Sequence, residues 1–125
     1  MFDYSRKLNP KQKVFTKAQF DQLVANYKAN ESCEEPVDFK PVVKLFGGAA
    51  CTWLLTELDP ETGIAFGLCD LGMGSPEMGY VSIDEIIGIK FPPFGLPAER
   101  DLWFEAKKPL SEYAEDARNR GMIRA

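Results

Sequence analysis

The stretch Thr52–Gly79, TWLLTELDPETGIAFGLCDLGMGSPEMG, decides the fold. β-Branched, aromatic and aliphatic residues fill the segments on either side of Asp59–Gly63, and such residues favour strands. The intervening DPETG has a proline that sets φ for a type I turn and a glycine suited to the left-handed position of a bulged hairpin loop. The stretch therefore predicts a β-hairpin followed by a glycine-rich loop.

Side chains should alternate along the second strand of this hairpin, because successive residues of a strand point to opposite faces. One face has large apolar side chains and the other is nearly smooth: Ile64, Phe66 and Leu68 against Ala65, Gly67 and Cys69. We expect a core on the large face and close packing of backbone or of a helix on the smooth one. A platform for a ligand is the alternative for the smooth face.

The composition is that of one folded domain. The chain has 125 residues, of which 45% are hydrophobic and 12% aromatic, enough for an ordinary core. No apolar run is long enough to span a bilayer, and no secretory signal opens the chain. We therefore expect a cytoplasmic protein that does not bind a membrane.

The cysteine and histidine contents limit the chemistry. Three cysteines without a C-x-x-C motif favour reduced thiols over a zinc site, with a bridge between Cys51 and Cys69 across the hairpin as the alternative. Histidine is absent, which removes Ser-His-Asp and Cys-His triads and nearly all familiar zinc sites. We predict no cofactor, and any enzymatic activity would have to rest on carboxylates, lysine, tyrosine or a thiol.

The net charge of −4 is unevenly distributed. Residues 1–30 sum to +4, residues 31–105 to −10 and residues 106–125 to +2. An acidic body repels phosphates, so we do not expect it to bind nucleic acid through its main surface. It suits the basic surface of another protein.

The first fifteen residues have no clear period, contain Pro10 and are basic. We therefore expect an N-terminal arm (residues 1–15), a single domain (residues 16–120) and a short C-terminal tail (residues 121–125). The candidates for phosphate contacts in the arm are Arg6, Lys7, Lys11 and Lys13. A solubilising terminus is the alternative.

Capping boxes mark two helix starts, Thr16 with Gln19 and Ser82 with Glu85. The first helix has apolar residues at i, i+3, i+4 and i+7 from Phe20, which is the spacing of one buried face.

Three further elements complete the predicted fold. Val42–Phe46 predicts a strand that pairs with the main hairpin, Leu102–Phe104 predicts a last strand, and Pro109–Gly121 predicts a terminal helix. The fold class is therefore α+β, an antiparallel sheet of four to five strands with two or three helices packed mainly on one face.

Three segments are candidates for function. Phe91–Pro97 (FPPFGLP) is a stiff apolar loop, either a contact surface or a lid over the sheet edge. Glu99-Arg100-Asp101 predicts an ion-pair network, with an anion site as the alternative. Carboxylates cluster at the hairpin turn, where they are either an acidic contact or a solvated face. The candidate interaction surface comprises Phe91, Pro93, Phe94, Leu96, Glu99, Arg100, Asp101, Glu57, Asp59 and Glu61.

Several short motifs together resemble one known family. They look like those of the bacterial family catalogued as domain of unknown function 2958, over roughly Thr16–Ala117, and are Thr52-Trp53, Thr56-Glu57, Phe66-Gly67-Leu68, Met78-Gly79-Tyr80 and Gly95–Asp101 (GLPAERD). The resemblance implies a small protein of the kind often encoded on plasmids and other mobile elements, near antirestriction and conjugation genes. It implies no catalytic residues.

Three classes of function follow from these observations. We favour a non-catalytic interaction protein of a mobile element, which binds another protein and inhibits or modulates a host defence or DNA-processing system through its acidic surface. The alternatives are a metal-dependent enzyme that uses the carboxylates and a nucleic-acid accessory protein that acts through the basic arm.

Overall fold

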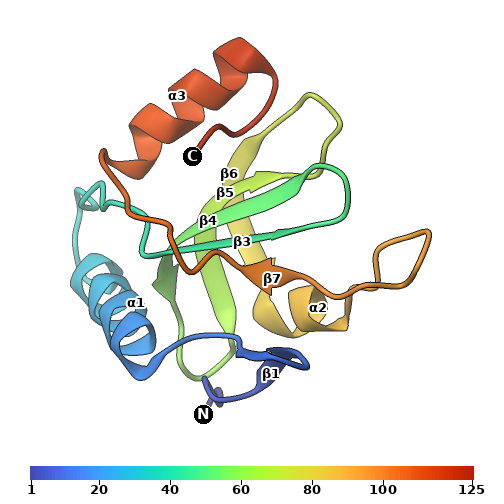
Figure 1. Ribbon diagram of the computed structural model, residues 1–125. Helices are drawn as coiled ribbons and strands as arrows, with labels where there is room; N and C mark the ends of the chain where they lie inside the picture. The colour runs from blue at the N-terminus through green and yellow to red at the C-terminus, as the bar shows by residue number, and fades with distance from the viewer.

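A five-stranded antiparallel sheet forms the centre of the computed structural model, which describes residues 1–125 (Figure 1). The strand order is β6-β5-β4-β3-β7. The strands are β3 (Val43–Gly47), β4 (Cys51–Leu58), β5 (Ile64–Asp70), β6 (Glu77–Ser82) and β7 (Glu99–Arg100). The predicted hairpin is confirmed, since β4 and β5 pair on either side of the Asp59–Gly63 turn.

Three helices and a small second sheet accompany it, so the α+β class is confirmed. They are α1 (Lys17–Glu31), α2 (Ile83–Gly88), α3 (Leu110–Arg120) and the hairpin β1 (Lys7–Asn9)–β2 (Gln12–Lys13). The predicted capping box of Thr16 and Gln19 is present at α1, and Ser82 accepts a hydrogen bond from the backbone N–H of Glu85 at α2. Gly121 ends α3 at φ 75°, in the left-handed conformation.

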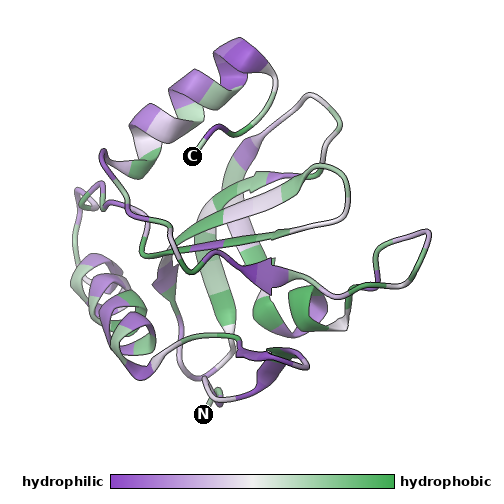
Figure 2. Ribbon diagram, viewed as in Figure 1, coloured by the Kyte–Doolittle hydropathy of each residue, from purple (hydrophilic) through white to green (hydrophobic).

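Apolar residues pack on both faces of the sheet. Helices α1 and α2 and the N-terminal hairpin cover the face that holds Trp53, Leu55 and Ala65. Helix α3 covers Leu54 and Leu68 on the opposite face. Figure 2 shows the central strands as largely hydrophobic, α1 as a mixture of hydrophobic and hydrophilic residues, and α3 as mainly hydrophilic. The smooth face of β5 therefore lies against the larger core, where small residues let other elements approach closely.

The segment predicted as an arm packs into this larger core. The side chains of Leu8, Val14 and Phe15 are almost completely buried, and the backbone N–H of Phe2 donates to the carbonyl of Pro60 at 2.6 Å. The difference has a physical reason: the apolar residues of a short irregular hairpin follow neither the helix nor the strand period. Residues 1–15 thus contribute to the core as well as to the basic surface.

The last strand lies earlier than predicted. Leu102 and Trp103 form a turn, Phe104 belongs to no strand, and Glu99–Arg100 pairs instead with Phe46 and Leu45 of β3. The side-chain amide of Gln12 explains the shift, because it accepts from the backbone N–H of Arg100 and donates to the carbonyl of the same residue, both at 2.9 Å. These bonds act like a further rung of the sheet and hold β7 in place.

A β-bulge interrupts the pairing of β4 with β5 between Leu55 and Glu57. The extra residue places Glu57 opposite Phe66 and Leu58 opposite Ala65, so Leu58 reaches the larger core. Without the bulge, the strict alternation of a strand would point Glu57 into that core. The bulge therefore directs the half-buried side chain of Glu57 to the face of the sheet that α3 covers only in part.

The buried Asn26 of α1 holds this bulge, because its side-chain amide donates to the carbonyl of Thr56 at 2.9 Å. We expect Asn26→Ala to lower the free energy of unfolding by about 2 kcal/mol, since a buried carbonyl then loses its partner. For a chain of this size that corresponds to a fall in Tm of roughly 8 °C, measurable by circular dichroism. Gln22→Ala, which removes a more exposed bond to Asn26 at 2.7 Å, is the control and should lower Tm far less. Equal falls for the two variants would contradict this role of Asn26.

Candidate interaction surface

The loop Phe91–Pro97 forms one wall of an open cleft of about 570 Å³, which we call the loop cleft. The tip of the β1–β2 hairpin and the turn between β3 and β4 form the other walls, so three segments far apart in the sequence meet here. Figure 1 shows the loop projecting from the sheet beside α2. The lining residues are Asn9, Pro10, Lys11, Phe46, Gly47, Gly48, Ala49, Phe91, Pro92, Pro93, Phe94, Leu96, Pro97 and Glu99.

The base of this loop is held firmly. The backbone N–H of Phe91 donates to the carbonyl of Leu96 at 2.7 Å, and the N–H of Leu96 donates back at 3.1 Å. The buried ring of Phe91 lies so close to Gly47 that an added Cβ would come within 2.3 Å of it. Phe94 at the tip is nevertheless 82% exposed, and the side chain of Leu96, whose backbone belongs to the base, is 59% exposed. A fixed loop thus presents two apolar side chains to solvent.

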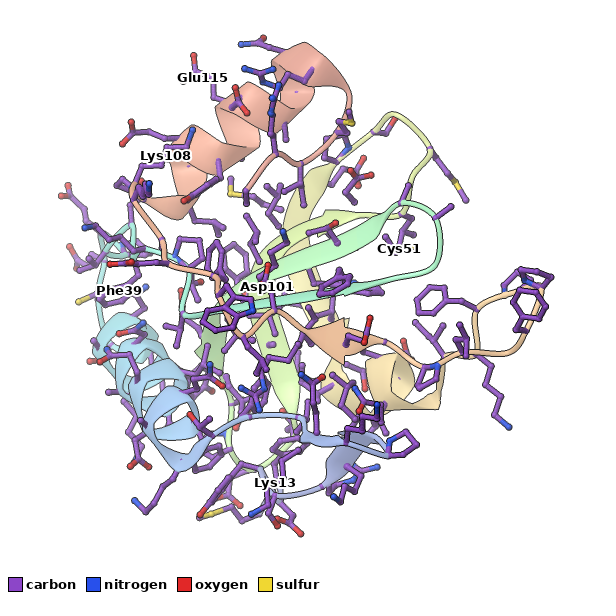
Figure 3. The ribbon with its side chains drawn as sticks, in the orientation of Figure 1. Lys13, Phe39, Cys51, Asp101, Lys108 and Glu115 are labelled. Carbon is purple, nitrogen blue, oxygen red and sulfur yellow. The ribbon has the colours of Figure 1, made fainter.

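The loop cleft is lined by five of the residues predicted for the surface: Phe91, Pro93, Phe94, Leu96 and Glu99. Arg100 and Asp101 do not line it. The expected ion-pair network has a different form. Asp101 pairs with Lys44 of β3 at 3.4 Å, and Figure 3 shows Asp101 beside that strand. The Nε of Arg100 instead donates to the carbonyl of Lys13 at 3.4 Å, and burial lowers the pKa of this guanidinium. These contacts join the loop segment to the sheet.

The basic residues predicted for phosphate contacts are spread over the N-terminal hairpin. Arg6 forms an ion pair with Asp84 of α2. Lys7, Lys11 and Lys13 are exposed, and only Lys11 lines the loop cleft. The structure therefore brings one predicted basic residue to the apolar loop.

The carboxylates of the hairpin turn lie at a second, separate concavity of about 620 Å³, which we call the acidic hollow. Glu57 and Asp59 line it, whereas Glu61 is exposed outside it. The complete lining is Tyr27, Asn30, Glu31, Pro36, Glu57, Asp59, Thr62, Ile64, Phe66 and Tyr80. Sequence reasoning did not group these residues, because four elements and the bulge at Thr56 are needed to bring them together.

Comparison with known proteins identifies the family. A family model described as "Protein of unknown function (DUF2958)" matches residues 14–124. The chain belongs to this family. No curated protein and no solved structure matches this chain.

The DUF2958 match covers the whole acidic hollow and all of the loop cleft except the hairpin tip at residues 9–11. The family description names no activity, so the chemistry of both concavities rests on the residues of this chain. None of the three helices is both long and apolar enough to cross a membrane.

Two of the three free cysteines of this DUF2958 member lie on strands of the central sheet, and the third, Cys33, is exposed. Cys51 and Cys69 are half-buried free thiols, and burial raises the pKa of both, which keeps them protonated. No group of three or more cysteine, aspartate or glutamate side chains lies close enough together to hold a metal ion. The residues that line the two concavities offer apolar contacts and charged groups.

Proposed function

We propose that this chain is a non-catalytic interaction protein, and that it binds another protein through the loop cleft. The observation that carries the proposal is the pair of exposed apolar side chains, Phe94 and Leu96, on a loop whose base is fixed by two backbone hydrogen bonds. Aromatic side chains held in place before binding are typical anchors of interfaces, because little conformational entropy is lost when they are buried.

The surroundings of the loop support the same proposal. Prolines 92, 93 and 97 and the rings of Phe46 and Phe91 line the cleft, so an apolar side chain of a partner would find an apolar wall. Lys11 and Glu99 lie at its rim and offer one charge of each sign for orientation. That the partner belongs to a host defence or DNA-processing system, and that this chain inhibits it, stay predictions.

Photo-cross-linking tests this proposal. With p-benzoylphenylalanine in place of Leu96, we expect a discrete cross-linked protein in a host lysate. The double variant Phe94→Ala/Leu96→Ala, used as an unlabelled competitor, should compete at least tenfold less well than the unmodified chain. Trp103→Ala is the matched control, because Trp103 is 92% exposed and lies outside the cleft.

Both substitutions in the double variant are at exposed positions, so its Tm should stay within a few degrees of the unmodified chain. Full competition by the double variant, or equal loss of competition by Trp103→Ala, would contradict the proposal.

One observation favours a second candidate function, a nucleic-acid accessory role. Lys7, Lys11 and Lys13 are exposed on one small hairpin and have no acidic partner. Reversing all three charges should abolish a salt-dependent DNA shift if this role is real. An unchanged shift, or none with the unmodified chain at low salt, would remove it.

A further inference from the structure

The outer edge of β6 is open. The strand is the last of the five-stranded sheet on its side, so its outward backbone groups face no other strand. Natural edge strands are commonly protected by charged side chains, above all lysine, by proline or by a bulge. Met78–Ser82 contains none of these, and the six residues of β6 pair with β5 in an unbroken register. Such an edge can accept an added strand, since its N–H and C=O groups are already spaced for one.

A row of side chains leads from this edge into the acidic hollow. Tyr80 of β6 lies directly opposite Phe66 of β5, which lies opposite Glu57 of β4. The two rings meet edge to face with their centroids 5.2 Å apart. Helix α3 covers Leu54 and Leu68 farther along the same face but leaves Tyr80 77% exposed. From the edge inward, the row therefore consists of the ring of Tyr80, the ring of Phe66 and the carboxylate of Glu57.

The inner end of the hollow is negative and uncompensated. Glu31, Glu57 and Asp59 line it, whereas no lysine or arginine does. Burial raises the pKa of Glu57 even though the amide of Asn30 donates to its carboxylate at 3.1 Å. The pKa of Tyr27 is raised by burial and then by the charges of Asp59 and Glu31. A cation would therefore stabilise the desolvated carboxylate of Glu57.

We propose that the edge of β6 and the acidic hollow together bind an extended, arginine-containing segment of a partner protein. The backbone of the segment pairs along Met78–Ser82, and one guanidinium lies over the ring of Tyr80 and points toward Glu57. The observations favour a polypeptide over a polyamine because the open edge offers hydrogen bonds that only another backbone completes. They favour arginine because its planar cation both stacks on an aromatic ring and forms two hydrogen bonds with a carboxylate.

This surface is distinct from the loop cleft, so the inference does not rest on the proposed function and can fail independently of it. Its test uses the full chain and a fluorescein-labelled twelve-residue peptide in which arginine alternates with threonine, followed by fluorescence anisotropy at low and moderate salt. We expect saturable binding that weakens as salt rises, and no binding of the same peptide with glutamate in place of arginine.

Two variants probe the row. Glu57→Gln keeps the oxygen that accepts from Asn30 but removes the charge, and Tyr80→Ala removes the exposed ring. Each should weaken peptide binding by about fivefold, as expected for one partly exposed charge pair or one cation–π contact. The first matched control is Glu115→Gln, which makes the same change at an exposed glutamate that Figure 3 shows on α3 and that does not line the acidic hollow. The second is Trp103→Ala, which removes an exposed ring outside the hollow. These controls should bind within twofold of the unmodified chain.

Backbone pairing has its own readout. Saturation with the peptide should shift the amide NMR signals of Met78–Ser82 and slow their hydrogen exchange, because amides that pair with an added strand become protected. The proposal would be overturned if the peptide bound both row variants as well as the controls, or if β6 amides were unaffected. It would equally be overturned if spermidine displaced the peptide at equal concentration of charge, since a small cation would then be sufficient.

Discussion

Phe15→Ala is expected to lower the free energy of unfolding by about 3–5 kcal/mol, the usual cost of removing a fully buried aromatic ring. Phe15 has no exposed surface and lies in the larger core, with its ring centroid 6.1 Å from that of Phe2. Loss of the ring leaves a cavity between the N-terminal hairpin and the sheet. Equilibrium unfolding in urea, followed by tryptophan fluorescence, measures the change.

Lys13→Ala is the control for Phe15→Ala, because Lys13 is exposed two residues away and should change stability by less than about 0.5 kcal/mol. Equal urea midpoints for the two variants would show that residues 1–15 do not belong to the core. If the expected difference is found, a deletion of residues 1–15 would also remove part of the core. A loss of DNA binding by such a deletion would then not distinguish unfolding from the loss of phosphate contacts. Charge reversal at the lysines is then the valid test of the basic surface.

The parts of the fold that could be predicted depend on local signals. The DPETG turn, the capping box at Thr16 and the stop at Gly121 each act within a few residues, and each lies where the sequence indicates. The N-terminal hairpin and β7 could not be predicted in the same way. They are held by contacts between residues about 90 positions apart, such as Gln12 with Arg100, and no periodicity records such contacts.

The two candidate sites differ in the same way, since one depends on local sequence and the other on contacts between distant residues. The loop Phe91–Pro97 could be singled out because its rigidity and its apolar side chains are both properties of one short segment. The acidic hollow could not, since Tyr27, Phe66 and Tyr80 acquire a common surface only through the register of three strands and the position of α1. Glu57 was a candidate because of its charge, but its orientation depends on a bulge that alternation does not predict.

Gly67→Ala is the second substitution expected to have a large effect. Gly67 lies opposite Leu55 beside the bulge, where an added Cβ would come within 2.0 Å of the carbonyl oxygen of Leu54. The nearest atoms belong to the backbone of β4, so no side chain can rotate away and the strand itself must move. We expect a loss of about 3 kcal/mol or more in the free energy of unfolding, at the upper end of overpacking effects.

The structure offers a matched control for this substitution, because Gly67 pairs directly with Gly79 on the outer strand. An added Cβ at Gly79 has no atom within 4 Å, so Gly79→Ala should leave stability unchanged or raise it slightly. Urea unfolding of the two alanine variants compares the same chemical change at two partners of one pair.

A shift of β4 at the bulge would also turn Glu57 away from Phe66, so Gly67→Ala should weaken peptide binding in whatever fraction stays folded. Equal urea midpoints for Gly67→Ala and Gly79→Ala would contradict the close approach of β5 to β4, and with it the arrangement that directs Glu57 into the acidic hollow.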